Sequence, residues 1–277
     1  MSSALEKALN VLEFMVERPQ GTSISEISSG LDMPVSGVHR LMKELEKNGY
    51  VRQTRNQGDY KLCLKLISMG LSYLGHSGIS NVSQPILDRL AQQTGELIRL
   101  GLPDGDQLVW TGAAQGASGG LYYDAASEMG KQVHLASTAT GQAWLAALTD
   151  EEAVRLVTQQ GLLKSVDTDN TTPPPGPNAP QTIHELLDTL QAVRKRGYSI
   201  CVDTFVPGIA AMSAAILQPG SGQAIGTVSI AGPSVRLTRQ RMESFAEDLF
   251  RAAQELGVAS RAAPYFAPDT SPIRKIA

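Results

Sequence analysis

The stretch TSISEISSGLDMPVSGVHRLMKELEKNGYVRQTRNQGDYKLCLK, residues 22–65, decides the fold of the N-terminal part of the chain. Its segment Ser23–Glu26 has capping-box spacing, which predicts that a short helix begins there. Pro34 suits the first turn of a second helix, in which residues 38–45 place apolar side chains at i, i+3, i+4 and i+7. Residues 50–62 then have the pattern of a β-hairpin around an Asn-Gln-Gly-Asp turn. This order predicts a winged helix-turn-helix.

The outward face of the second helix is polar, small near its start and basic further on, as in a helix that reads a DNA groove. From Pro34 to Lys65 there are seven Lys or Arg and three acids, so this segment is net +4 in a chain that is net −3. Phosphate contacts supply much of the affinity of such proteins. A solvated charged face on an ordinary helical hairpin is the alternative interpretation. The predicted DNA-binding residues are Ser25, Val35, Ser36, Gly37, His39, Arg40, Lys43, Arg52 and Arg55.

Composition favours an ordinary globular protein with two domains. The chain has 277 residues, of which 42% are hydrophobic and 18% charged, and a pI near 5.8 restricts DNA contact to a local surface. The two cysteines, Cys63 and Cys201, lie far apart and form no CxxC, which favours a reducing compartment. The N-terminus lacks a signal-peptide pattern, and no apolar run reaches about 18 residues. We therefore expect a cytoplasmic protein without a membrane partner.

The remaining sequence predicts further helices with a set of antiparallel strands. A capping box at Ser3 starts an apolar-striped helix that ends before Pro19, and Gly75 and Gly78 mark hinges in a linker helix or merely cap it. The high proline content of residues 171–180 predicts an extended loop. Helices are expected at 85–94, 142–148, 149–161, 183–196 and 238–256, and strands at 97–103, 107–112, 121–123, 198–202, 211–217 and 224–230.

No motif indicates catalysis, a metal site or a bound cofactor. The four histidines are scattered, none has a second His or Cys at i+3 or i+4, and HExxH, GxSxG and GxGxxG are absent. A lone histidine is more often a surface or helix-end residue than a ligand. We expect neither enzymatic activity nor a cofactor.

Several motifs together resemble the IclR family of bacterial transcriptional regulators. They are EKALNVL (6–12), MPVSGVHRLM (33–42), EKNGYV (46–51), GYSI (197–200), FVPGI (205–209) and SIAGP (229–233). The resemblance runs from about Leu5 to Leu256, and it implies an α+β protein with an N-terminal winged helix-turn-helix and a C-terminal GAF-like effector-binding domain, a helix-flanked antiparallel sheet. The expected domains are 1–68 for DNA binding, 69–83 for the linker helix, 84–260 for effector binding and oligomerisation, and 261–277 for a flexible tail.

The resemblance also implies an effector cleft for small organic acids or aromatic metabolites. The amides of residues 138–141, at a helix start, could hold a carboxylate without a cation. Compared with the family, Asp203-Thr204 keeps one acid of a frequent pair, and Ala211 and Ala231 replace larger or polar residues, which suggests a less polar and roomier pocket. The alternative is that Cys201 and Ser229 are only core residues of strands. The cleft positions matched by motif are Tyr122, Ala125, Val133, Ala139, Thr140, Cys201, Ile209, Ala211, Ser229 and Ala231.

These observations predict a ligand-responsive DNA-binding transcriptional regulator, with repressor as the family-weighted choice, that controls a catabolic operon. Its expected partners are double-stranded operator DNA, a small-molecule effector, and copies of itself in a homodimer or a tetramer. Two alternatives stay open at this point. One is a metabolite-binding sensor or enzyme with an incidental winged-helix domain, and the other is a winged-helix module that binds an acidic protein.

Overall fold

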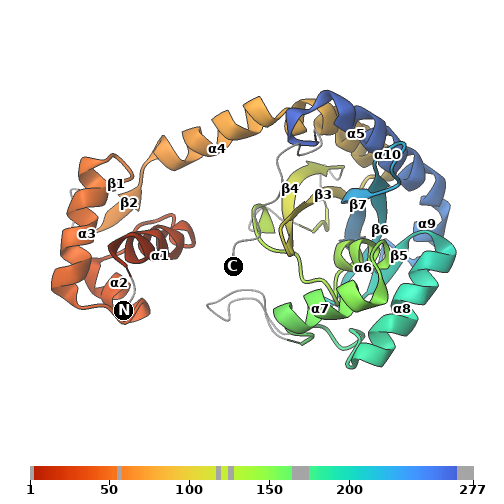
Figure 1. The fold of residues 1–277 in the computed structure, drawn as a ribbon, viewed down its shortest axis with the longest axis horizontal. Helices are drawn as coiled ribbons and strands as arrows, with labels where there is room; N and C mark the ends of the chain where they lie inside the picture. The colour runs from red at the N-terminus through yellow and green to blue at the C-terminus, as the bar shows by residue number, and fades with distance from the viewer. Residues whose placement is uncertain (1–2, 55–57, 117–119, 124–127, 164–174, 267–277) are drawn as a thin grey trace. The chain divides into compact units, whose positions relative to one another are not determined.

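The computed structural model describes residues 3–54, 58–116, 120–123, 128–163 and 175–266, and the chain divides into two compact units, Met1–His76 and Ser77–Ala277. Arg55 and Ala125 lie outside the described residues. The observed fold class is α+β, as predicted: a helix-turn-helix unit is followed by a mixed unit that contains an antiparallel sheet (Figure 1). In the parts that the structure describes, no helix is long and apolar enough to span a membrane.

The N-terminal unit is a winged helix-turn-helix. The capping boxes at Ser3 and Ser23 form as predicted, with Glu6 and Glu26 as their acidic members. The buried side chains that hold the unit together come from three helices and both strands of the wing. The elements are α1 (Ala4–Val16), α2 (Ile24–Gly30), α3 (Val35–Lys47), β1 (Val51–Gln53), β2 (Tyr60–Leu62) and α4 (Leu64–Ser77).

The turn between α2 and α3 is fixed by close packing and by local hydrogen bonds. The Oγ of Ser28 donates to the carbonyl oxygen of Met33 at 2.6 Å, and Asp32 has a φ of 48°. A Cβ at Gly30 would lie 2.3 Å from the ring of Phe14, so only glycine lets α2 approach α1 this closely. These contacts set the direction in which α3 leaves the turn.

The C-terminal unit is built on a five-stranded antiparallel sheet of strand order β4-β3-β7-β6-β5. Alternating side chains of β3, β6 and β7 pack on one face against α5 and α10 in the largest hydrophobic core. The other face lies under α6, next to a second core that involves α7 and α8 (Figure 1). The elements are α5 (Ile79–Thr94), β3 (Leu97–Asp104), β4 (Gln107–Gln115), α6 (Ala139–Ala146), α7 (Asp150–Gln160), α8 (Ile183–Arg196), β5 (Ser199–Val202), β6 (Ile209–Leu217), β7 (Ala224–Pro233), α9 (Arg239–Ser244), α10 (Ala246–Ala259) and two short 3₁₀ turns, η2 (Ser260–Ala262) and η3 (Pro264–Phe266).

The second face of the sheet is unusually polar for a buried surface. Arg99, Ser213, Thr227 and Ser229 all lie on it, and each is at most 5% exposed. Helix α6 approaches this face closely, because a Cβ at Gly101 would lie 3.0 Å from the side chain of Thr140. The polar face and α6 together enclose the cavity described below.

Four predicted elements are wrong in extent or kind. Helix α5 begins at Ile79, not at Pro85; Pro85 lies inside it on an exposed side, where the carbonyl left without an amide partner is open to water. Residues 121–123 form no strand. Helix α6 begins at Ala139 because Thr138 caps it, three residues before the predicted start. The last predicted helix is two helices that meet at Phe245.

Candidate functional site

The predicted DNA-binding residues that the structure describes lie on α2, α3 and β1 of the N-terminal unit, and most of them are exposed. Ser36, His39, Arg40 and Lys43 are exposed on α3, and Gly37 between them is half-buried. Val35 at the start of α3 is apolar and 57% exposed. Ser25 on α2 and Arg52 on β1 are also exposed.

The cations of this face are not used by the fold. In the described part of the chain, Arg40, Lys43 and Arg52 make no ion pair or side-chain hydrogen bond. Lys65 differs, because its Nζ donates to the carbonyl oxygen of Asn48 at 2.8 Å and lies 4.5 Å from the ring centre of Tyr50. Three uncommitted cations on and beside a helix are what binding to phosphates requires.

A cavity lies in the C-terminal unit between the polar face of the sheet and the start of α6. Its described wall comes from β3, β5, β6, the loop that carries Tyr123, the start of α6 with the two residues before it, and the loop after β5. Most of these wall residues are apolar or carry a hydroxyl, and one of those described is charged. They are Arg99, Tyr123, Ser137, Thr138, Ala139, Thr140, Cys201, Thr204, Phe205, Val206, Ile209 and Ala211.

Half of the predicted effector positions contribute to this wall, namely Ala139, Thr140, Cys201, Ile209 and Ala211. Ala125 lies outside the described residues, and the other four do not line the cavity. Tyr122 is 47% exposed, and Val133 is buried in the second core. Ser229 and Ala231 are buried on β7 beneath the cavity.

The amides of residues 138–141 stay a predicted carboxylate site, and the cavity also contains a cation that was not expected. Arg99 lines the cavity and is 5% exposed, and its guanidinium carbon lies 3.8 Å from the ring centre of Trp110. Its Nη1 forms an ion pair with Glu128, whose second oxygen accepts from the hydroxyl of Tyr123. Burial, opposed by the nearby Arg99, raises the pKa of Tyr123, so this hydroxyl stays a donor at neutral pH.

The sequence itself carries a signal that marks Arg99 as a functional residue. It is the lone charge in the run Leu97-Ile98-Arg99-Leu100, which is buried throughout. A charged residue in a fully buried strand needs a partner, so it marks an ion pair or a ligand site.

The expectation of a roomier pocket than one for a two- or three-carbon acid stays a prediction. The cavity volume is about 20 Å³, which is enough for roughly one water molecule. Phe205 and Val206, which the motif contains but which were not predicted as ligand residues, contribute to the wall. An organic acid therefore requires some of the wall side chains to move.

Two further groups at the cavity have local roles. The thiol of Cys201 donates to Oε1 of Gln142 at 3.3 Å, and burial raises its pKa to about 12, so it is neutral. The Oγ of Ser137 lies 2.7 Å from Nδ1 of His134, a distance suited to nucleophilic catalysis. However, the same Nδ1 accepts from the backbone amide of Ser137, which identifies a tight turn before α6. His134 is thus a buried turn residue, not the surface residue that its isolation favoured.

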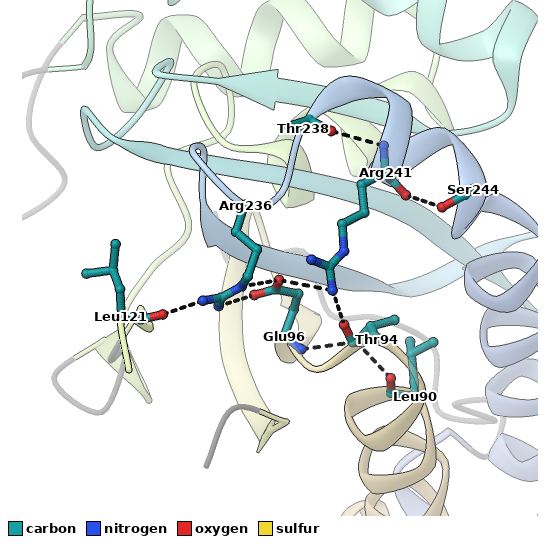
Figure 2. Close-up of polar contacts among 8 residues, drawn as sticks. All are labelled: Leu90, Thr94, Glu96, Leu121, Arg236, Thr238, Arg241 and Ser244. Atoms are coloured by element: carbon teal, nitrogen blue, oxygen red, sulfur yellow. Dashed lines mark hydrogen bonds and ion pairs between the residues drawn. The ribbon is translucent and has the colours of Figure 1, made fainter. Parts of the chain in front are cut away.

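A buried ion pair anchors the loop that carries Tyr123. Figure 2 shows Arg236 donating to both oxygens of Glu96, at 2.8 and 2.7 Å, and also to the carbonyl oxygen of Leu121. Arg241 lies 3.8 Å from the same carboxylate, which is 1% exposed. The loop at residues 121–123 is therefore tied to the end of β7.

Family models match both units. The IclR helix-turn-helix domain matches residues 4–55, and the bacterial transcriptional regulator IclR C-terminal domain matches residues 71–258. The HTH-type transcriptional repressor AllR of Escherichia coli strain K12 is 27% identical over 258 residues, which cover 93% of this chain and 90% of AllR.

Solved structures of similar chains agree. The IclR protein of Thermotoga maritima is 28% identical, with a TM-score of 0.71, and the match covers 94% of this chain and 98% of that one. An IclR homologue of Microbacterium hydrocarbonoxydans, solved in complex with 4-hydroxybenzoate, is 19% identical and matches with a TM-score of 0.75 over 94% of this chain and all (100%) of that one. The second match shows the fold alone.

Proposed function

This chain belongs to the IclR family of bacterial transcriptional regulators, and from that premise we propose that it represses a catabolic operon until an organic or aromatic acid binds its C-terminal cavity. A ligand-responsive, DNA-binding regulator is the function that the whole chain supports. The related AllR is a repressor, and a more distant homologue holds 4-hydroxybenzoate. Repression and an acid effector are our extension of those findings to this protein.

The observation that carries the proposal is the presence of two cationic sites in one chain. Arg40 and Lys43 are exposed cations without a partner among the described residues, as DNA binding requires. Arg99 is a buried cation in the wall of a cavity, paired there with Glu128, and a cation in such a place suits recognition of an acid. The first site suits DNA and the second a carboxylate.

We propose that the exposed face of α3 enters the major groove, with Ser36, Gly37, His39 and Arg40 at the bases. Lys43 and Arg52, with Arg55, would contact phosphates. Two copies would then read a roughly palindromic operator. The proposed domains keep the expected bounds, with residues 69–83 as the connector between DNA binding at 1–68 and effector binding at 84–260.

An effector changes DNA affinity only if it binds one arrangement of the dimer more tightly than another. The connector is where we propose that this difference is transmitted. Helix α4 ends at Ser77 and α5 begins at Ile79, and Gly78 between them has a φ of 74°. A glycine in this conformation permits the break between two helices.

We infer that the protein binds its effector without converting it and acts in the cytoplasm, where operator DNA lies. The pairing of Ser137 with His134 is explained by the turn, and both residues are at most 1% exposed. Prolonged incubation with a bound acid should leave the acid unchanged by NMR. Turnover would instead favour the enzyme hypothesis.

The test starts from duplexes selected from a random DNA library with the full chain. We expect an inverted repeat among them. In a titration against salt, Arg40→Ala combined with Lys43→Ala should weaken binding through the lost base contact of Arg40, and should lower the slope of log K against log salt by about 1 through the lost phosphate contact of Lys43, since each such contact contributes about 0.9. Arg251→Ala, which removes an exposed cation of α10, is the matched control and should change neither quantity.

If the double variant kept its affinity and salt slope, α3 would not be the DNA-reading helix. Failure to select any duplex, together with capture of an acidic protein by the same face, would favour the protein-interaction hypothesis. A selected palindrome with an altered salt slope supports the regulator.

A further inference from the structure

We propose that Arg99 is the carboxylate anchor of the C-terminal cavity and that Glu128 occupies, in the ligand-free protein, the position that an effector's carboxylate takes. This inference rests on the proposed function, because it names how the effector would be held. It adds a residue, Arg99, and an internal competitor, Glu128, that neither the motifs nor the relatives indicate.

Arg99 is buried, but not all of its N–H groups have a hydrogen-bond acceptor in the described structure. It is 5% exposed, and its Nε is buried without a hydrogen-bond acceptor among the described residues. Buried polar groups are normally satisfied, and an exception calls for a reason. Glu128 accepts from Nη1 with one oxygen and from Tyr123 with the other, so Glu128 leaves Nε free.

A second unsatisfied group lies beside the first. Ser229 is the cross-strand neighbour of Arg99 in the pairing of β3 with β7, and its Oγ is also buried without a partner in the described part of the chain. Side chains directly opposite each other in a sheet are within about 5.5 Å at Cβ. Two unsatisfied groups at one position of the polar face indicate a site that the protein alone does not complete.

The charge balance of the cavity points the same way. Among the described residues of the wall, Arg99 alone is charged, and Glu128 neutralises it. A carboxylate that entered while this pair stayed intact would place an uncompensated negative charge in a largely buried site, which is unfavourable. A carboxylate that replaces Glu128 keeps the cavity neutral.

The two members of the pair differ in their ability to leave. The side chain of Arg99 is 6% exposed and is held over Trp110, whereas that of Glu128 is 22% exposed. Glu128 can therefore be rehydrated when it is displaced, and Arg99 cannot. The backbone of Glu128 stays close to β4, because Lys131 donates to its carbonyl oxygen at 3.0 Å and Trp110 donates to that of Lys131 at 3.1 Å.

The ligand class follows from the same geometry. A planar guanidinium prefers a carboxylate that takes two parallel N–H donors, which Glu128 does not do here. Beside the hydroxyl groups of the wall, Phe205, Val206 and Ile209 contribute apolar side chains that suit a hydrocarbon or aromatic body. The site is therefore one for a monocarboxylic acid with an apolar body.

The test uses acetate, because Glu128→Ala removes the atoms that acetate replaces. In the full chain, this variant should melt at a lower temperature than the wild type in sodium chloride. Sodium acetate at equal ionic strength should raise its melting temperature by a few degrees and should raise that of the wild type far less. Acetamide, the neutral analogue, should have no effect.

The control is the double variant Glu128→Ala with Arg99→Gln, which should not respond to acetate. If Glu128→Ala is unfolded in chloride, recovery of its far-UV circular dichroism in acetate becomes the readout. Equal effects of acetate on the wild type, the single variant and the double variant would overturn the proposal, as would the absence of any effect on Glu128→Ala.

The experiment distinguishes failure of the Arg99 anchor from failure of the proposed regulator function. Failed rescue by acetate would remove Arg99 as the anchor and leave DNA binding and its response to acids untouched. Successful rescue in a protein that selects no DNA would keep the anion site and remove the proposed function.

Discussion

At the scale of single residues, the buried polar groups of the C-terminal unit separate structural from functional roles. Glu96 is fully paired with Arg236, and Cys201 is neutral and hydrogen-bonded, so both are stable parts of the fold. Arg99 and Ser229 retain unsatisfied donors in the described structure. Substitutions at Glu96 or Cys201 should therefore change stability, and substitutions at Arg99 or Ser229 should change ligand binding.

Replacing Arg236 should destabilise the protein strongly. Arg236→Ala would leave the carboxylate of Glu96, which is 1% exposed, with Arg241 at 3.8 Å as its nearest cation (Figure 2). Breaking a buried pair costs about 3–5 kcal/mol of unfolding free energy, measurable by urea denaturation. Arg239→Ala removes an exposed i,i+4 partner of Glu243 and should cost about 1 kcal/mol or less. Similar losses in the two variants would show that Glu96 does not depend on Arg236.

Cys201 should make the protein less stable at alkaline pH. Its pKa rises from an ordinary 9.0 to about 12 on folding, so the unfolded chain releases this proton first. The stabilising contribution is complete below pH 9 and is lost as the pH rises towards 12. Cys201→Ala should therefore lose stability less steeply over this range in melting experiments. Cys63→Ala is the matched control and should keep the slope of the wild type.

At the scale of elements, local signals predicted well and tertiary contacts decided the rest. The caps of α1 and α2 form at the predicted Ser3 and Ser23 because capping needs only neighbours in sequence. Helix α5 extends past Pro85 because its buried face packs on the sheet, which no local pattern reveals. The cavity likewise brings Arg99 together with the loop after β5. These segments lie about 100 residues apart, so no local sequence pattern predicts that they line the same cavity.

A substitution in helix α3 should change stability and DNA affinity in opposite directions. No atom of the described structure lies within 4 Å of the position that a Cβ at Gly37 would take. Gly37→Ala should therefore stabilise the helix by about 0.5–1 kcal/mol, yet weaken operator binding because a methyl group would stand between backbone and bases. Gly70→Ala on α4 is equally unhindered and should stabilise without affecting DNA. Unchanged DNA affinity in Gly37→Ala would argue against close contact there.

At the scale of the whole molecule, exposed apolar residues indicate self-association. On α4, Leu64, Ile67 and Leu71 are 73%, 57% and 64% exposed, and their spacing places them on one side of the helix. On α1, Leu5 and Leu9 are 70% and 49% exposed. Apolar stripes of this extent on a helix favour pairing with a second copy, which agrees with the proposed dimer on a palindromic operator.

We expect Ile67→Asp combined with Leu71→Asp to shift the protein towards monomers in sedimentation experiments. Two charges on an apolar contact surface disfavour its burial. The affinity for the operator should fall as the dimer is lost, because a monomer reads only one half-site. Ser68→Asp combined with Ser72→Asp adds the same charge to neighbouring positions of α4 and should leave the assembly unchanged. An unaltered assembly in the first variant would place the interface elsewhere.

We propose that one molecule couples acid binding to DNA binding. The most direct measurement is the dissociation constant for the selected operator at increasing concentrations of the carboxylic acid that most raises the melting temperature of the full chain. Coupling of about 1–3 kcal/mol predicts a change of about 5- to 150-fold, and the operator should change the affinity for the acid by the same factor. If an acid bound the cavity but left the dissociation constant for the operator unchanged, the proposed coupling would be contradicted.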